Sequence, residues 1–112
     1  MANLVIDDRE VTVSLSVTEK LEALHGDIRV PRAAVLQVRV VPDGMEEVHG
    51  LKMPGAGLRG VIMVGTWRDG EVVTFAVCHG RQPAVVLDLA DQVYDRIVVT
   101  MDNPEEVAAR LS

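Results

Sequence analysis

The chain has 112 residues, 48% of them hydrophobic, and a formal net charge of −6 at neutral pH. This length and hydrophobic share indicate one folded domain, residues 1–112, and exclude an intrinsically disordered chain. The negative charge argues against nonspecific binding to nucleic acid or to an anionic membrane surface.

The single cysteine, Cys78, precludes an internal disulfide bond and fits a reducing compartment. No basic segment followed by an apolar run marks a signal peptide, and no run reaches the roughly 20 apolar residues that a membrane-spanning helix needs. We therefore expect a cytoplasmic protein without a membrane span.

The N-terminal part of the chain predicts two strands and a short helix. Residues 3–7 form a short strand, and residues 11–17 alternate apolar and polar side chains, the period of a strand with one buried face. Ser16 and Glu19 have the spacing of a capping box, which begins a helix, and Gly26 is placed to end it. The apolar residues of this helix share one face: Val17, Leu21 and Leu24.

The middle of the chain predicts one strand and one long loop. Residues 28–30 are extended and end at Pro31, and residues 36–40 alternate again. The inward-facing residues of this second run are Leu36, Val38 and Val40. Residues 45–59 are rich in glycine and contain a proline, which suit neither helix nor strand, so we expect a loop there. Loops of that length are often functional or mobile.

The most strongly patterned stretch is GVIMVGTWRDGEVVTFAVCHGRQPAVVLDL, residues 60–89. It predicts three consecutive strands joined by tight turns at residues 68–71 and 79–82, because Asp-Gly between two β-rich runs is a strong hairpin signal. The expected core-facing residues are Val61, Met63 and Trp67, then Val73, Phe75 and Val77, then Val85, Leu87 and Leu89.

Apolar residues also occupy the opposite face of these strands. A sheet with one solvated face does not need them, so we expect a covering element or a partner chain on that side. The residues assigned to this interaction surface are Ile62, Val64, Val72 and Ala76.

The chain ends with a strand and a helix. Residues 96–101 alternate as a last strand, and Asn103 and Pro104, followed by two glutamates, have the order that favours a helix start. The apolar stripe of this helix is Val107, Ala108 and Leu111. The sequence thus predicts a mainly β fold of seven strands, with a short helix after the second strand and another helix at the C-terminus.

Three segments resemble a group of bacterial pleckstrin-homology-like (PH-like) proteins, best known from actinobacteria. They are VSLSVTEKLEALHGDIRVPRAAVLQVRVV, GLKMPGAGLRGVIMVGTWR and YDRIVVTMDNPEEVAARL, and the resemblance covers nearly the whole chain. It implies a seven-stranded antiparallel split barrel capped by the C-terminal helix. A different small β-barrel with a helix is the alternative.

The resemblance implies a protein-interaction or oligomerisation module, because bacterial PH-like domains are thought of mainly in those roles. PH domains that bind phosphoinositides use a basic cluster between their first two strands. Here that turn is Asp7, Asp8, Arg9 and Glu10, three acids and one base. The departure argues against phosphoinositide binding at the usual site.

Residues 49–60 suggest a ligand site. Backbone amides freed by the glycines could cradle an anion with charge from Lys52 and Arg59, although the Gly-Lys-Ser/Thr ending of a P-loop is absent. His49 and Arg68 complete the set of candidate ligand-binding residues. A mobile loop, or one that contacts another subunit, is the alternative.

The sequence predicts no metal site and no catalytic site. His25, His49 and His79 fall at a helix end, in the long loop and at a strand end, so their spacing does not bring them together. Cys78 and His79 are neighbours in a strand and point to opposite faces, so we expect a half-buried, inert thiol. We expect no cofactor and no enzymatic activity.

Two functional hypotheses follow. The first is a non-enzymatic cytoplasmic PH-like module that binds a protein partner or forms a homo-oligomer. The second is a small-molecule or anion-binding barrel that uses residues 49–60.

Overall fold

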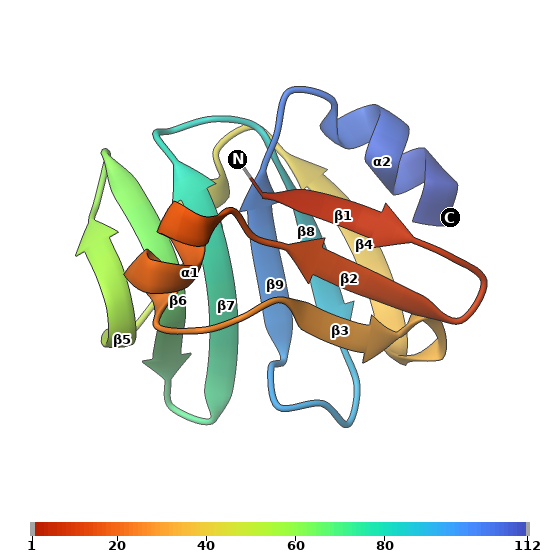
Figure 1. Ribbon diagram of the computed structural model, residues 1–112, viewed down its shortest axis with the longest axis horizontal. Helices are drawn as coiled ribbons and strands as arrows, with labels where there is room; N and C mark the ends of the chain where they lie inside the picture. The colour runs from red at the N-terminus through yellow and green to blue at the C-terminus, as the bar shows by residue number, and fades with distance from the viewer. Residues whose placement is uncertain (1, 112) are drawn as a thin grey trace.

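The computed structural model describes residues 2–111, in which nine strands form two sheets (Figure 1). The smaller sheet is antiparallel and has the order β1–β2–β3: β1 Asn3–Ile6, β2 Glu10–Ser14 and β3 Ile28–Pro31. The larger sheet has the order β4–β8–β9–β7–β6–β5: β4 Val35–Val41, β5 Leu51–Leu58, β6 Ile62–Asp69, β7 Val72–His79, β8 Ala84–Leu89 and β9 Arg96–Thr100. The helices are α1 Val17–Ala23 and α2 Pro104–Leu111, with the 3₁₀ turns η1 Arg32–Ala34 and η2 Gly44–Glu47.

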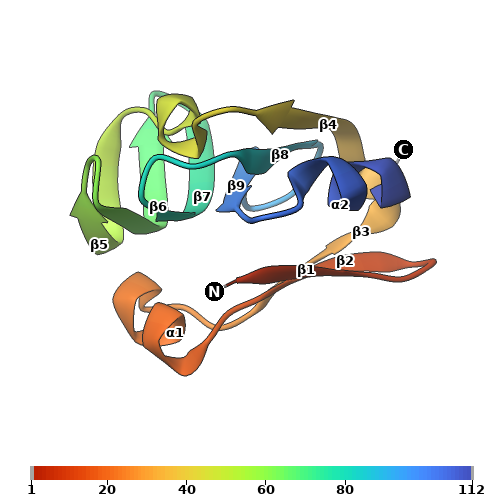
Figure 2. The ribbon, with the colours of Figure 1, turned by 90° about the horizontal axis from the view of Figure 1, so that it is seen from above.

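The two sheets form two layers (Figure 2). The three-stranded sheet lies across one face of the six-stranded sheet, which we call the inner face; the other is the outer face. Helix α1 packs against β5 and β6, and α2 packs against β4 and β8. The mainly β architecture with a C-terminal helix is confirmed, but the sheets are not closed, so the predicted seven-stranded barrel is wrong. The PH-like family stays a prediction based on the sequence motifs.

The strand β5 is the clearest departure from the predicted loop at residues 45–59. It pairs antiparallel with β6 at the edge of the sheet, and its register shifts between Lys52 and Gly55. A register shift at a sheet edge accommodates proline and glycine, which a central strand tolerates poorly. Composition alone therefore predicted a loop where pairing with a neighbour makes a strand.

The hairpin β6–β7 is confirmed, with Gly70 at φ 60° in its turn. The second predicted hairpin is wrong, because β9 lies between β7 and β8 and pairs in parallel with β7. The all-antiparallel prediction is wrong for the same reason. The apolar pattern of these strands shows that they are buried, but it does not say which strand lies next to which.

Each face of the six-stranded sheet carries a buried cluster. The inner cluster lies between the layers and includes Phe75, Leu87 and Ile97 from the large sheet and Val11 and Val13 from the small one. The outer cluster consists of Met45, Val48, Met63, Trp67, Ala76, Cys78, Ala84, Val86 and Val98. The sequence predicted a covering element on the opposite face of these strands, and this element is η2 together with Val48.

Three face assignments need correction. Val61, predicted to face the core, lies just before β6 and is 60% exposed. In β6, Met63 and Trp67 belong to the outer cluster, and Val64 belongs to the inner one. In β4, Leu36 is exposed, because the register shifts between Val35 and Gln37. The predicted inward residues of β7 and β8 are in the inner cluster, except Val73, which is half-buried and packs against it.

The helix α1 begins with the predicted capping box. Ser16 Oγ accepts a hydrogen bond from Glu19 N at 3.1 Å, and Glu19 Oε1 accepts one from Ser16 N at 2.8 Å. Leu24, in the left-handed conformation at φ 53°, ends the helix, so Gly26 does not have the predicted role. The apolar stripe faces away from the core: Val17, Leu21 and Leu24 are 70–75% exposed.

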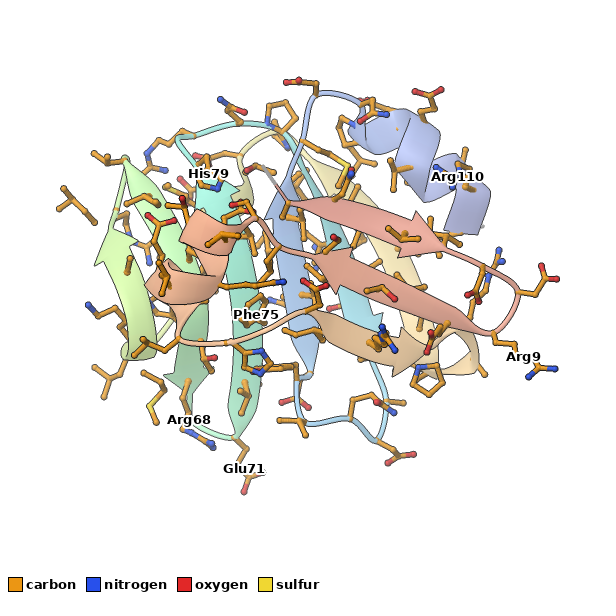
Figure 3. All side chains as sticks on the ribbon, viewed as in Figure 1. Arg9, Arg68, Glu71, Phe75, His79 and Arg110 are labelled. Atoms are coloured by element: carbon orange, nitrogen blue, oxygen red, sulfur yellow. The ribbon has the colours of Figure 1, made fainter. Side chains whose placement is uncertain are left out.

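The buried face of α1 carries Ala23, which joins the inner cluster, and Glu19, which anchors the helix by hydrogen bonds. Glu19 is 2% exposed, and its Oε2 accepts hydrogen bonds from Ala2 N at 2.9 Å and from His79 Nε2 at 2.6 Å. Figure 3 places His79 at the end of β7, beside α1. Burial alone raises the pKa of the Glu19 carboxyl, but hydrogen bonds from Ser16 and His79 outweigh it, so the pKa lies below its usual value.

A second polar network crosses β4, β8 and β9. Asp88 accepts from Arg39 Nε at 3.0 Å and from Arg96 Nε at 3.1 Å, and Arg39 also donates to Glu47 at 2.6 Å. Burial raises the pKa of Asp88, but these two guanidinium groups lower it further, so the net shift is downward. The network thus keeps Asp88 charged.

Candidate functional site

Two of the four predicted ligand-binding residues, Lys52 and Arg59, line one cleft. The cleft has a volume of about 280 Å³, and its lining comes from the β5–β6 hairpin and the residues just before it: Gly50, Leu51, Lys52, Gly57, Arg59, Met63 and Trp67. His49 and Arg68 do not line it. Arg68 follows Trp67 in β6, and successive side chains of a strand point to opposite faces; His49 is exposed just before β5.

The guanidinium of Arg59 is fixed by the backbone. Its Nη1 donates to the carbonyl of Met45 and its Nη2 to the carbonyl of Val48, both at 2.8 Å. Both acceptors are neutral carbonyls, so neither offsets the positive charge of the guanidinium, which has further N–H groups to donate. By contrast, Arg39 and Arg81 each pair with carboxylates.

The apolar wall of the cleft is formed by Trp67 and Met63, which are both nearly buried in the outer cluster. Lys52 lies opposite Trp67 across the β5–β6 pair. Gly57 makes this packing possible, because a Cβ there would lie 2.9 Å from Trp67 Cζ2 and 3.0 Å from Lys52 Cδ. The sequence pointed to the two cations of the cleft; it assigned Trp67 and Met63 to the core and gave no sign that they also line a cleft.

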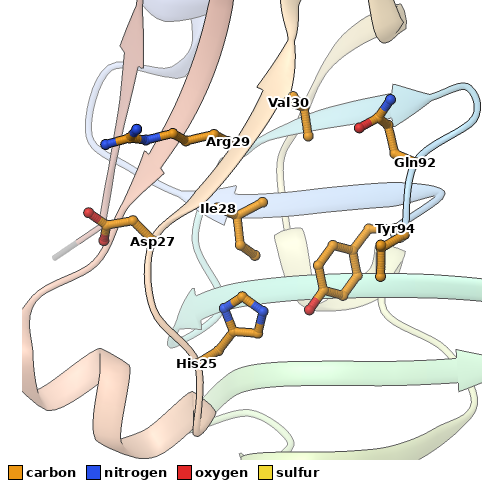
Figure 4. A pocket seen from close by; sticks show the side chains of 8 residues that line it. His25, Asp27, Ile28, Arg29, Val30, Gln92 and Tyr94 are labelled. Atoms are coloured by element: carbon orange, nitrogen blue, oxygen red, sulfur yellow. The ribbon is translucent and has the colours of Figure 1, made fainter.

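A second cavity, of about 230 Å³, lies between β3 and the loop before β9 (Figure 4). His25 and Tyr94 lie beside each other there, with ring centroids 6.1 Å apart, while the side chains of Asp27 and Arg29 point away from them. Asp27 is already engaged, since it accepts a hydrogen bond from Leu15 N at 2.8 Å. The lining of this cavity is mixed: Ile28, Val30 and Val93 are apolar, and the other lining residues, Arg29 and Asp27 among them, carry polar groups.

Exposed apolar side chains gather where α1 packs against β5. Leu51 opposes Arg68 and Leu58 opposes Ile62 across the β5–β6 pair, which places both leucines on the inner face, the side on which α1 lies. We call this surface the apolar end; its exposed members are Val17, Leu21, Leu24, Leu51, Met53 and Leu58. The sequence contained these residues but gave no reason to expect them at the surface.

The predicted interaction surface is largely buried. Val64 belongs to the inner cluster and Ala76 to the outer one, and both are fully buried, so neither can contact a partner. Ile62 is half-buried and packs against the inner cluster, which leaves only Val72, at 44% exposed. The prediction failed because the sheet is covered on both faces by other parts of the same chain.

The three histidines lie apart, and in residues 2–111 no group of three His, Cys, Asp or Glu side chains is placed to hold a metal ion. Cys78 is fully buried rather than half-buried. Burial, with a smaller contribution from Asp43, raises the pKa of its thiol to about 12.

Comparison of the chain with protein-family models, with curated proteins and with solved structures finds no match. Within residues 2–111, neither helix has the length and apolar character that crossing a membrane requires.

Proposed function

We propose that this protein is a cytoplasmic, non-enzymatic interaction module that pairs with a second copy of itself through the apolar end. The observation that carries the proposal is the orientation of α1, whose three large apolar side chains all point away from the core. An amphipathic helix normally buries that face. A partner that packs on this face of α1 buries the three side chains that the rest of the chain leaves exposed.

The size of the apolar end supports a dimer contact. Burying one aliphatic side chain removes about 60–120 Å² of apolar surface from water, so these six partly exposed side chains offer roughly 400 Å². Each side of a standard protein interface buries about 800 Å², a little more than half of it apolar. The apolar end therefore supplies most of the apolar half of such an interface.

A second copy of the chain has a surface that is complementary to the apolar end. A two-fold dimer brings the same patch of both subunits together, and an apolar patch is complementary to itself. Basic residues at the same end, among them Lys20 in α1 and Arg68 opposite Leu51, reduce the repulsion that a net charge of −6 would otherwise produce between two copies.

The contact is expected to be made by side chains and not by pairing of the β5 edges. Lys52 and the register shift in β5 protect this edge, and Pro54 brings no backbone N–H. These are the features by which proteins prevent edge strands from pairing. The helix face of α1 thus forms the centre of the proposed interface.

The test is the molecular mass in solution, measured by native mass spectrometry and sedimentation equilibrium over a range of concentrations. We expect a dimer for the natural chain, a monomer for Leu21→Glu, and a dimer for the control Val93→Glu. Val93 is 82% exposed in the loop before β9, so the control adds the same charge at another exposed apolar position. A natural chain that stays monomeric at every concentration, or a Leu21→Glu variant that stays dimeric, would contradict the proposal.

A further inference from the structure

We infer that the cleft at Lys52 and Arg59 binds a small planar organic carboxylate, independently of the proposed dimer contact. Lys52 lies opposite Trp67, whose side chain is in the outer cluster, whereas Leu58 lies opposite Ile62, which packs on the inner cluster. Lys52 is therefore on the face of the sheet opposite to α1, and Leu51 is the residue that the cleft lining and the apolar end share. A ligand in the cleft leaves α1 free for a partner.

The charge of the cleft is the first reason for an anion. Its lining contains one lysine and one arginine and no acidic residue. Lys52 forms no ion pair within residues 2–111, and the two hydrogen-bond acceptors of the Arg59 guanidinium are neutral carbonyls. In a chain with a net charge of −6, these two cations are left without a counter-charge in their own cleft.

The rigidity of Arg59 favours a carboxylate. The two bonds to Met45 and Val48 hold the guanidinium in one orientation before any ligand arrives, so little side-chain entropy is lost on binding. A guanidinium presents its N–H groups in a planar fork that matches the two oxygens of a carboxylate. Lys52 adds a mobile point charge, which adapts to the position of the anion.

The apolar wall favours a planar group attached to the carboxylate. Trp67 and Met63 are 4% and 2% exposed, so only their edges reach the cleft, and a flat apolar group can lie against these edges. The volume of about 280 Å³ lies just below the range of drug-sized pockets. A single ring that carries a carboxylate matches both the wall and the size.

The tryptophan itself provides the reporter. The chain has one tryptophan, so a two-dimensional amide NMR spectrum contains one indole N–H signal, which belongs to the cleft. Benzoate is the probe for a planar carboxylate, and inorganic phosphate is the probe for an anion without an apolar part. We expect benzoate to shift the Trp67 signal in a saturable manner, and phosphate to produce no such shift at the same concentrations.

Two variants, each lacking one positive charge, show whether benzoate binding depends on the cleft or only on the overall charge of the protein. Lys52→Ala is expected to weaken benzoate binding about five-fold, the scale of one exposed ion pair. Arg9→Ala removes a charge from the turn at the far end of the molecule (Figure 3) and is expected to leave binding unchanged. Both positions are exposed, so neither variant disturbs the core.

These benzoate experiments test the proposed ligand class independently of whether the protein forms a dimer. No saturable shift with benzoate, or the same affinity for Lys52→Ala as for the natural chain, would overturn it. Phosphate binding as tightly as benzoate would overturn the planar carboxylate as the ligand class. The Leu21→Glu variant should bind benzoate as the natural chain does, so failure of the proposed self-association leaves this result standing.

Discussion

Replacing Glu19 by alanine removes the group that holds α1 to the rest of the protein. The carboxylate accepts three hydrogen bonds from outside the body of the helix: from Ser16 N, from Ala2 N and from His79 Nε2, at 2.8, 2.9 and 2.6 Å. A hydrogen bond of this kind contributes about 1 kcal/mol net. We therefore expect Glu19→Ala to lower the free energy of unfolding by about 3 kcal/mol.

The matched control is Glu22→Ala, one turn further along the same helix. Glu22 accepts no hydrogen bond and forms no ion pair within residues 2–111, so its loss should change stability by less than about 0.5 kcal/mol. Urea unfolding followed by circular dichroism measures both variants. Equal stabilities for Glu19→Ala and Glu22→Ala would refute the role given to the carboxylate.

The same carboxylate predicts a pH dependence. Its pKa in the folded protein lies below the ordinary value of 4.5, so its contribution to stability is complete above pH 4.5. The contribution is lost as the pH falls through the folded-state pKa. The natural chain should consequently lose stability more steeply than Glu19→Ala below pH 4.5, and identical slopes would show that folding does not lower the pKa of Glu19.

Three further predictions test other parts of the structure. Gly57→Ala should lower the free energy of unfolding, measured with urea, by about 1–3 kcal/mol, because its Cβ would press on Trp67. A Cβ at Gly26 has no atom within 4 Å, so the control Gly26→Ala should change this free energy by less than about 0.5 kcal/mol. Asp88→Asn should cost about 1–2 kcal/mol by the same measurement, because it removes the charge shared by two arginines; an unchanged midpoint would contradict this. The buried Cys78 thiol, with its pKa raised to about 12, should react with a thiol reagent only when the protein unfolds, and rapid labelling of the native protein would disprove its burial.

Local signals in the sequence were sufficient for several elements. The start of α1 depends on Ser16 and Glu19, the start of α2 on Pro104, and the β6–β7 turn on Gly70, and all three occur as predicted. Each of these features is decided by groups within about four residues of one another, through capping hydrogen bonds or backbone dihedral angles. The sequence also identified the mainly β class and the two cations of the cleft.

The neighbour of each strand and the exposed face of each element depended on the tertiary structure. β5 is a strand because β6 lies beside it, and α1 turns its leucines outward because Glu19 reaches Ala2 and His79, both far away in the sequence. Ala76, whose exposure the sequence suggested, is buried because η2 covers the outer face. Periodicity shows that a residue lies on an apolar face, but only the packing of distant segments determines whether that face is covered, since burial is a property of the whole fold.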